Sequence, residues 1–443
     1  MHGARWLVIL LAWGAGCRPS SETNIAARPL EPPAAAVDLD PDPGRLEVRL
    51  VAERASDGSY RYSGARPGPT LRARVGDRVV VHLDNALTDP TTIHWHGVGV
   101  PNDMDGVPWV TGTVAPGESF TYAFTVERAG TFWYHPHFDT ARQVDRGLHG
   151  LFVVEDPSQP ALPELLLVFD EPDEGGPHPI HGHGRLGTHW TVNGTETPVA
   201  HRLVESGRMR ARVLNASNTA YLWLESSDPS SLELRAVAGD QGFDGGPREA
   251  PVLVGPGDRV ELELGVRSAA SLRTRRWSLN GGEVPYAPAV ELVRFQVDTT
   301  GDLSSSPDWP FSGALPTPDV ARTDVLWALM GSDRSGRWTI NAEVFPNITP
   351  ETLPLGRPAI VEVRNMSPTE HPFHLHGFVF ELLSRNGVAP PFRTIEDTIN
   401  VRIRERLRLR VTPERPGDWM AHCHILPHAD GGMMTVLRVP PQP

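Results

Sequence analysis

One pattern of residues occurs three times along the chain: a glycine, a strand-like run and an asparagine. The copies are residues 76–85 (GDRVVVHLDN), 207–215 (GRMRARVLN) and 356–365 (GRPAIVEVRN). The motif HWHG follows the first copy at the same spacing as HLHG follows the third, and GTFWYHPH and GDWMAHCH come later in the same order. Motifs that recur in order indicate duplicated domains. A chain of 443 residues holds about three domains of ordinary size. We place them at 44–157, 158–303 and 304–443.

Short runs of alternating apolar residues predict that these domains consist of β-strands. Alternation is clear at 79–83, 260–264 and 407–411, and many of the 44 Pro and 42 Gly lie between such runs. Alternation favours half-buried strands, and no long stretch has the periodicity of an amphipathic helix. We therefore predict an all-β fold of sandwich or barrel domains. With 54 acidic and 41 basic residues, a formal charge of −13, the chain is a poor general binder of nucleic acids.

The N-terminal residues predict export. A single Arg5 precedes an apolar run at 6–13 and the segment Gly14-Ala15-Gly16-Cys17, which is typical of a secretion signal and too short to span a bilayer as a mature helix. Cys17 stands where a bacterial lipoprotein signal places its lipidated cysteine; the alternative is an ordinary cleaved signal. Residues 18–43 are rich in Pro, Ala and Asp and predict a flexible tether. We expect an exported protein, periplasmic or anchored to the membrane by a lipid.

Eight of the 18 histidines form four His-x-His pairs in the first and third expected domains. Side chains two residues apart on a strand point to the same face, so each pair offers two imidazoles to one metal cluster. Two pairs fall in the first expected domain and two in the third, whereas the middle copy has Leu224 and Ser226 instead. Eight imidazoles exceed what one zinc ion needs and suit a cluster of about three copper ions. The pairs are His94/His96, His135/His137, His374/His376 and His422/His424.

A second set of ligands has the opposite strand parity. Cys423 lies between the histidines of the last pair, so its sulfur points to the other face of the strand. His371 has an odd spacing from the third pair, and His428 and Met433 follow Cys423 in the segment HCHILPHADGGMM. Two imidazoles, a thiolate and a weak thioether form a blue-copper site, which explains a lone thiol in an exported chain. The two sites would lie about 10 Å apart, joined through the backbone of Cys423.

The motifs HWHG, HPH, HPFHLHG and HCHILPHADGGMM resemble, in this order, the four copper motifs of the three-domain multicopper oxidases, the laccase-like family. The resemblance covers nearly all of residues 44–443. It implies three consecutive cupredoxin-like Greek-key domains and four copper ions: one type 1, one type 2 and two type 3. It also implies the ligands: Cys423, His371, His428 and Met433 for type 1; His94 and His374 for type 2; and His96, His135, His137, His376, His422 and His424 for type 3. In the first domain Pro136 and Thr91 stand in the places of Cys423 and His371, so no type 1 site is expected there.

The resemblance implies that a substrate gives up single electrons at type 1 copper and that dioxygen is reduced to water at the trinuclear cluster. Cys423 and His428 would then carry electrons. Asp105 matches a carboxylate that the family keeps beside the cluster, although a turn residue in 103–106 is the alternative. The family often has a glutamate directly after the last type 1 histidine, where this chain has Ala429. Asp430 would have the other parity in an extended segment, which leaves a second proton route in doubt.

Phenol-like compounds, aromatic amines and metal ions are the candidate substrates, with dioxygen as acceptor. The alternative function is oxidation of cuprous ions or sequestration of copper. The eight Met are scattered, and the position four before His371, which is acidic in cuprous oxidases of the family, is Ser367. Glu396 and Asp397 would either lie near the type 1 site and accept a phenol proton or, as we prefer, be exposed loop charges.

A group of histidines in the middle domain has no acidic or cysteine partner at ligand spacing. It comprises His178, His181, His183 and His189. We predict a solvated loop rather than a further metal site, and a monomeric protein.

Overall fold

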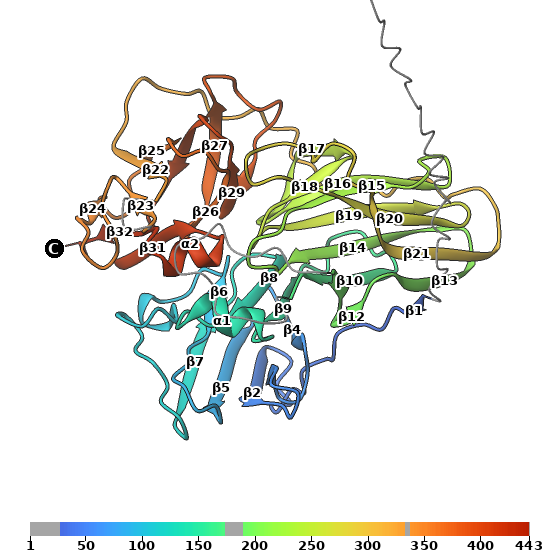
Figure 1. Cartoon of the computed structure of the whole chain (residues 1–443), viewed down its shortest axis with the longest axis horizontal. Coiled ribbons are helices and arrows are strands. Elements are labelled where there is room, and N and C mark those ends of the chain that lie inside the picture. Colours follow the sequence, from blue (N-terminus) through green and yellow to red (C-terminus); the bar gives the residue numbers. More distant parts are fainter. Residues whose placement is uncertain (1–26, 173–188, 333–336, 443) are drawn as a thin grey trace, which may run out of the picture.

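The computed structural model describes residues 27–172, 189–332 and 337–442. These residues form three β domains that meet at a common centre, with the first domain in blue and cyan, the middle one in green and yellow, and the third in orange and red (Figure 1). The described residues form six sheets, two within each expected domain apart from one added N-terminal strand. The prediction of an all-β chain of three cupredoxin-like domains is confirmed.

The first domain contains two four-stranded sheets, in the orders β3-β2-β5-β7 and β4-β9-β8-β6. A short 3₁₀ helix η1 (Asn102–Met104) and the helix α1 (Thr140–Asp145) lie between strands. The strands are β2 (Arg45–Arg54), β3 (Tyr60–Tyr62), β4 (Gly68–Arg74), β5 (Arg78–Asn85), β6 (His94–His96), β7 (Ser119–Thr125), β8 (Gly130–His135) and β9 (Gly150–Glu155).

The middle domain contains a seven-stranded sheet, β12-β11-β10-β14-β19-β16-β17, and a six-stranded sheet, β1-β13-β21-β20-β15-β18. Its strands are β10 (Glu164–Asp170), β11 (Thr191–Val192), β12 (Thr195–Glu196), β13 (Val199–Glu205), β14 (Gly207–Asn215), β15 (Leu222–Ser226), β16 (Leu232–Gly239), β17 (Gly242–Glu249), β18 (Val252–Val254), β19 (Arg259–Val266), β20 (Ala270–Arg276) and β21 (Val290–Thr299).

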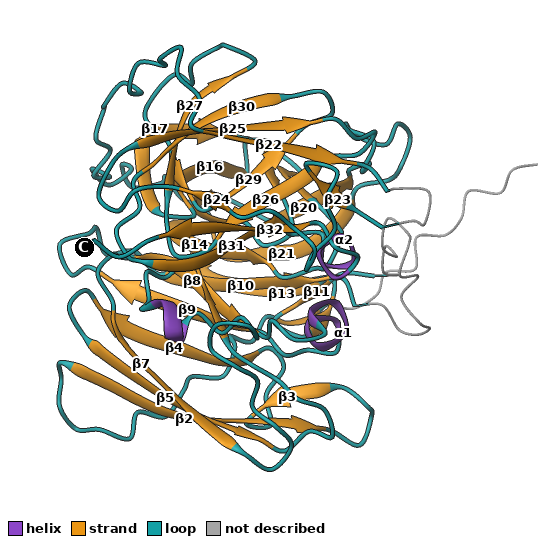
Figure 2. Cartoon of the chain, turned by 90° about the vertical axis from the view of Figure 1, so that its left-hand side faces the viewer, coloured by secondary structure: helices purple, strands orange, loops and turns teal. Residues whose placement is uncertain are grey.

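The third domain contains the sheets β23-β22-β25-β30-β27-β28 and β24-β32-β31-β26-β29. Its helix α2 (Leu426–Asp430) lies beside α1 of the first domain (Figure 2), where Ala141, Val144 and Leu426 form a small apolar cluster. The strands are β22 (Val325–Met330), β23 (Thr339–Ile340), β24 (Glu351–Thr352), β25 (Ala359–Asn365), β26 (His371–Leu375), β27 (Phe380–Arg385), β28 (Ile395–Glu396), β29 (Thr398–Val401), β30 (Arg406–Val411), β31 (Gly417–Cys423) and β32 (Met434–Val439).

The repeated glycine–strand–asparagine pattern has the same structural role in each domain. Its copies are β5, β14 and β25, and each pairs in parallel with the first long strand of its own domain, β2, β10 or β22. The closing asparagines, Asn85, Asn215 and Asn365, are buried. Each donates from Nδ2 to two backbone carbonyl oxygens and accepts a bond at Oδ1 from the amide two residues later. Because a buried amide needs such partners, the common spacing of the three copies reflects one turn built three times.

The expectation of a flexible tether over 18–43 is wrong for its described part. β1 (Arg28–Pro29) pairs in parallel with β13, and the amide of Leu30 donates to the carbonyl oxygen of Ala200. Further on, Thr70 exchanges backbone hydrogen bonds with Ala34 and Ala36. A proline-rich segment still offers carbonyl oxygens and amides to a sheet edge. Here the segment pairs with two edge strands, β13 of the middle domain and β4 of the first domain. The signal region and Cys17 lie outside the described residues.

Candidate copper centres

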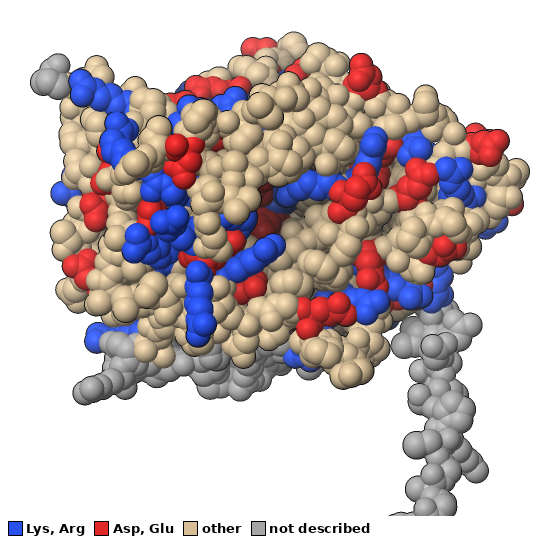
Figure 3. All heavy atoms as spheres, turned by 90° about the horizontal axis from the view of Figure 1, so that it is seen from above, with Lys and Arg blue, Asp and Glu red and all other residues tan. Residues whose placement is uncertain are grey.

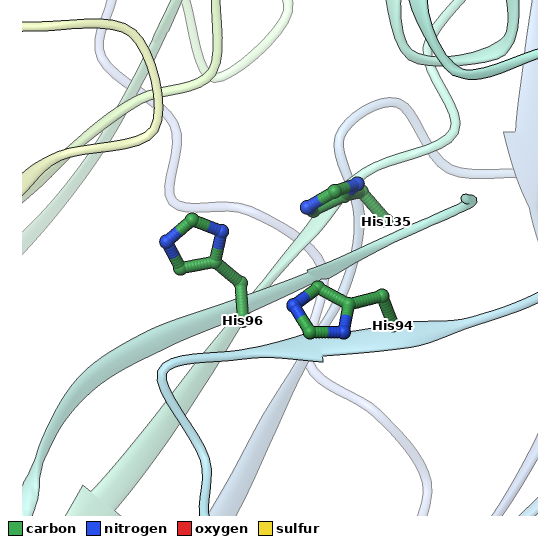
Figure 4. A group of neighbouring side chains, drawn as sticks. All are labelled: His94, His96 and His135. Carbon is green, nitrogen blue, oxygen red and sulfur yellow. The ribbon is translucent and has the colours of Figure 1, made fainter. Parts of the chain in front are cut away.

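The eight paired histidines come together between the first and third domains. His94 of β6 lies opposite His135 of β8, and His374 of β26 lies opposite His422 of β31. The side chains of His94, His96 and His135 point toward one shared space (Figure 4). All eight are buried, with at most 6% of any residue exposed. Two strand pairs from duplicated domains thus face each other with their histidines inward.

The ring nitrogens are close enough to share metal ions. Three groups have ligand atoms within 4.8 Å of one another: His94/His96/His135, His94/His374/His376 and His137/His376/His422. The ring of His424 lies 5.0 Å from that of His96 and 5.6 Å from that of His135, measured between centroids. Every paired histidine therefore lies in one continuous cluster.

The second nitrogen of several rings is fixed by the backbone. The Nδ1 atoms of His94, His135, His374 and His422 lie 2.8–2.9 Å from the carbonyl oxygens of Asp105, Pro136, Asp397 and Cys423. Nδ1 must donate in these bonds, which leaves the lone pair on Nε2. The Nε2 atoms of His94, His135 and His374 have no hydrogen-bond partner in the described parts of the chain. Buried nitrogens of this kind are costly unless a metal binds them, so the residues fit a copper cluster.

Electrostatics favour the neutral form of these rings. Burial lowers the pKa of the imidazoles well below its usual value, and neighbouring imidazoles lower the pKa further. This applies to His96, His135, His137, His376, His422 and His424. A metal binds the neutral imidazole, so the site holds its ligands in the required protonation state.

The type 1 candidates form a compact triangle on the other face of β31. The Sγ atom of Cys423 lies 3.3 Å from Nδ1 of His371 and 3.7 Å from Nδ1 of His428, and the two Nδ1 atoms are 3.4 Å apart. All three residues are fully buried. Burial raises the pKa of the Cys423 thiol, and a bound metal ion is what makes such a thiol ionise. The chemistry of this set fits blue copper.

Two further residues lie beside this triangle. Met433 is fully buried, and its carbonyl oxygen accepts a hydrogen bond of 3.2 Å from the amide of Cys423. The indole ring of Trp338 stacks on the imidazole of His428, with centroids 3.7 Å apart and an interplanar angle of 23°. His428 is therefore covered by an aromatic ring on one side. The axial role of Met433 stays a prediction.

A short path joins the two sites. Cys423 is bonded directly to His422 and His424, and the ring of His422 also donates to the carbonyl oxygen of Cys423. Covalent and hydrogen-bonded connections thus run from the thiol into the histidine cluster.

The chain is similar in sequence to known proteins. Two models of the multicopper oxidase family match residues 50–159 and 319–443. The multicopper oxidase mco of Staphylococcus haemolyticus is 30% identical over 85% of this chain and 83% of its own length. The chain belongs to the multicopper oxidase family. The multicopper oxidase MmcO of Mycobacterium tuberculosis is 28% identical over 96% of this chain and 90% of its own.

Among solved structures, a multicopper oxidase from Campylobacter jejuni superposes with a TM-score of 0.80 at 26% identity, covering 94% of this chain and 96% of that one. As a member of this family, the present chain couples the oxidation of a reducing substrate to the reduction of dioxygen, with copper as its cofactor. Copper supplies the one-electron redox chemistry, and the family set is one type 1, one type 2 and two type 3 ions. The assignment of individual ligands stays a prediction, for which the distances above supply the required proximity.

Asp105 lies beside the trinuclear site. Its Oδ2 atom accepts a hydrogen bond of 2.8 Å from Nδ1 of His376, and its carbonyl oxygen accepts one from Nδ1 of His94. Asp105 directly follows η1 and is 1% exposed. It is therefore both a turn residue and a partner of two cluster histidines, so the two alternatives describe one position.

Glu396 and Asp397 are not exposed loop charges, and this preference was wrong. Glu396 is 7% exposed and Asp397 1%, because both lie between the middle and third domains. Asp397 contacts His96 and His374 of the trinuclear site rather than the type 1 triangle. Burial opposes its ionisation, but the guanidinium of Arg259 holds the pKa of the Asp397 carboxyl well below its usual value. Nothing local in the sequence pointed to Arg259, 138 positions away.

The segment after His428 is not extended, so the parity argument for Asp430 does not hold. Leu426–Asp430 is the helix α2, with Ala429 buried at 1% exposure. The Oδ2 atom of Asp430 accepts a hydrogen bond of 2.9 Å from the amide of Ala141 near the start of α1. Asp430 thus joins α2 to the first domain.

A cavity of about 680 Å³ lies between the middle and third domains. Figure 3 shows a hollow on the side where these domains meet, with basic and acidic side chains around it. Asp240, Arg259 and Thr398 line the cavity, and Asp397 lies behind them. Burial raises the pKa of the Asp240 carboxyl well above its usual value, and burial raises the pKa of Asp258 to about 6. A wall of buried polar groups thus separates the cavity from the trinuclear site.

The histidine loop predicted at His178, His181 and His183 lies outside the described residues. Within the described ranges, no helix has the length and apolar character needed to cross a membrane.

Proposed function

We propose that this oxidase takes its electrons from small organic reductants, namely phenols and aromatic amines. The observation that supports this is the partner of His371. Its Nε2 atom lies 2.6 Å from the hydroxyl oxygen of Ser367, which also donates to Oδ1 of Asn365. The cuprous oxidases of the family have an acidic residue at this position. A neutral, 4% exposed hydroxyl offers no charge to an incoming cation. The ring stacked on His428 is an indole, which likewise carries no charge.

Cuprous ion is the second candidate. Met366, next to Ser367, is 65% exposed, and a thioether is a soft ligand that prefers Cu(I). The Campylobacter jejuni relative is a metallo-oxidase. One exposed thioether makes a weaker case for Cu(I) than the uncharged Ser367 hydroxyl beside His371 makes for phenols.

Oxygen consumption by the copper-loaded protein separates these candidates. A methoxyphenol, an azo-type electron donor and Cu(I) are each supplied to the wild type and to Met366→Leu. We expect the phenol to give the higher kcat/KM and Met366→Leu to leave it unchanged. If kcat/KM for Cu(I) exceeded that for every organic donor and Met366→Leu lowered it, cuprous ion would be the favoured substrate. Cys423→Ser is the control for uptake that does not pass through type 1 copper.

We also propose export with a lipid anchor at Cys17, and a monomeric state. The signal-like residues 1–17 support the anchor, and the formal charge of −13 disfavours self-association. Labelling with a radioactive fatty acid should mark the wild type and Cys423→Ser but not Cys17→Ala. Label retained by Cys17→Ala, or a dimer mass in light scattering, would contradict these proposals.

A further inference from the structure

The middle domain has Leu224 and Ser226 in place of a ligand pair, yet one of its turns lies against the trinuclear site. Gly257, in the turn between β18 and β19, has a φ of +83°. A Cβ atom there would lie 2.6 Å from Cγ of His424. Only glycine allows this approach, since any side chain would displace the imidazole. The middle domain thus forms one wall of the histidine cluster.

Arg259 follows this turn and begins β19. Its side chain is 0% exposed. Its Nε atom donates to the carbonyl oxygen of Thr131 in the first domain (3.0 Å), and Nη1 and Nη2 donate to those of Gly257 and Asp240 in the middle domain (3.2 Å each). Both terminal nitrogens also donate to the carboxylate of Asp397 in the third domain. One guanidinium therefore connects all three domains, and its rigid fork matches the carboxylate.

The carboxylate of Asp397 in turn contacts two histidines. Its Oδ1 atom lies 3.1 Å from Nε2 of His96 and 3.4 Å from Nδ1 of His374. The same Oδ1 accepts from the hydroxyl of Thr398, whose oxygen lies 2.9 Å from Nε2 of His96. An ionised carboxylate only accepts, so His96 must donate from Nε2 and keep its lone pair on Nδ1. That Nδ1 atom has no hydrogen-bond partner within the described residues. His96 thus offers Nδ1 where His94, His135 and His374 offer Nε2.

We propose that Arg259 and Asp397 are positioning residues of the trinuclear cluster. The guanidinium from the middle domain orients the carboxylate, and the carboxylate fixes the ring orientation and tautomer of His96 and supports His374. Ligand-orienting partners of this kind govern metal affinity as well as ligand geometry. The proposal rests on the assignment of His96 and His374 as copper ligands. It gives the middle domain a function at the copper site although none of its described residues is an assigned ligand.

A purely structural role for this ion pair would be to hold the domains together, and the chain offers a matched control. Arg212 is also a buried arginine at the interface of the first and middle domains, with 4% of its side chain exposed. Its described polar partners are Glu164, Glu261 and Thr131, none of them a histidine. Loss of its fork would weaken the interface without reaching the cluster.

The experiment compares copper-loaded Asp397→Asn, Arg259→Lys and Arg212→Lys with the wild type. In Asp397→Asn an NH2 group replaces one carboxylate oxygen, so the side chain can no longer accept from Arg259 at both of its oxygen positions, and lysine lacks the fork. The blue absorption reports the type 1 site and serves as the folding control. Copper per chain under chelator competition and the type 2 electron paramagnetic resonance signal report the cluster.

We expect Asp397→Asn and Arg259→Lys to stay blue but to bind cluster copper about 10–100-fold more weakly, with altered type 2 hyperfine splitting. Arg212→Lys should keep the wild-type signal and affinity. Wild-type values in both cluster variants, or an equal loss in Arg212→Lys, would overturn the proposal. If both cluster variants lose the blue band, Gln241→Met serves as the test variant, since Gln241 also donates to the carboxylate of Asp397. A wild-type type 2 signal in Gln241→Met would refute the proposal. His96→Ala tests the ligand assignment separately, because unchanged copper content and spectra would show that assignment to be wrong.

Discussion

Replacement of Asp105 by asparagine should slow one half of the catalytic cycle and leave the other unchanged. The carboxylate accepts a hydrogen bond of 2.8 Å from His376, and it is 1% exposed. Asparagine retains an oxygen that accepts from the same ring nitrogen, so the imidazole stays in place. The backbone bond from Asp105 to His94 does not involve the side chain. What is lost is a carboxylate able to exchange protons beside the site where dioxygen is reduced.

The size of the effect follows from what one acid–base group contributes. A positioned group of this kind accelerates a proton-coupled step about 10²–10⁴-fold, which corresponds to roughly 2.7–5.4 kcal/mol of activation free energy. Asp105→Ala should lose this contribution and also leave the buried N–H of His376 without its acceptor, at a further cost of about 1–3 kcal/mol in stability. The asparagine variant therefore isolates the proton function from the anchoring function.

Stopped-flow spectroscopy measures the two halves separately. Anaerobic bleaching of the blue band by substrate follows reduction of type 1 copper, and mixing of the reduced protein with dioxygen follows reoxidation. We expect Asp105→Asn to reduce at the wild-type rate and to reoxidise about 10²–10⁴-fold more slowly. Equal slowing of both halves, or unchanged reoxidation, would refute the reasoning and leave Asp105 as an anchor of His376 alone.

Three further predictions concern the type 1 site and the fold. Cys423→Ser should abolish the blue colour and turnover, because the thiolate that absorbs is gone, while copper analysis still finds the trinuclear ions; a serine variant that stayed blue would contradict the ligand assignment. Met433→Leu should raise the type 1 potential in a redox titration and keep the blue band. Met434→Leu should cost under about 1.5 kcal/mol in stability through packing alone. A potential shifted by Met434→Leu and not by Met433→Leu would show that Met434 is the axial ligand. Gly377→Ala should lower the free energy of unfolding by roughly 2–5 kcal/mol in chemical denaturation, since its φ is +70° and a Cβ would overlap the indole ring of Trp419 in β31. Gly356→Ala, with a φ of +72° and no atom within 4 Å, is the control and should lose only about 1–2 kcal/mol; equal losses would show that the close contact does not matter.

Features that depend on local spacing follow from the sequence alone. Histidines two apart on a strand share a face, and Cys423 between two of them takes the other face. The structure accordingly has the histidine cluster and the Cys423 triangle on opposite sides of β31. The repeat could also be recognised in the sequence, because each closing asparagine bonds residues of its own domain at a turn of fixed spacing.

Local parity failed where the local conformation differed from a strand. The residues after Cys423 turn into α2, so alternation said nothing about Asp430, which binds the amide of Ala141 across a domain boundary. The segment 27–43 has the composition of a tether, yet it pairs with sheet edges of the first and middle domains. Composition describes what a segment does in the absence of partners, and these partners come from distant parts of the chain.

The surroundings of the copper ligands depend on contacts between the domains. Asp397 has the sequence context of a loop charge, and its burial depends on Arg259, which a different domain supplies. No period or motif relates two residues 138 positions apart. A buried charge is tolerated only with a matched partner, and that partner exists only once the domains have packed against each other. The ligands therefore lie in short sequence motifs, whereas the groups that orient them are brought together only when the three domains pack against each other.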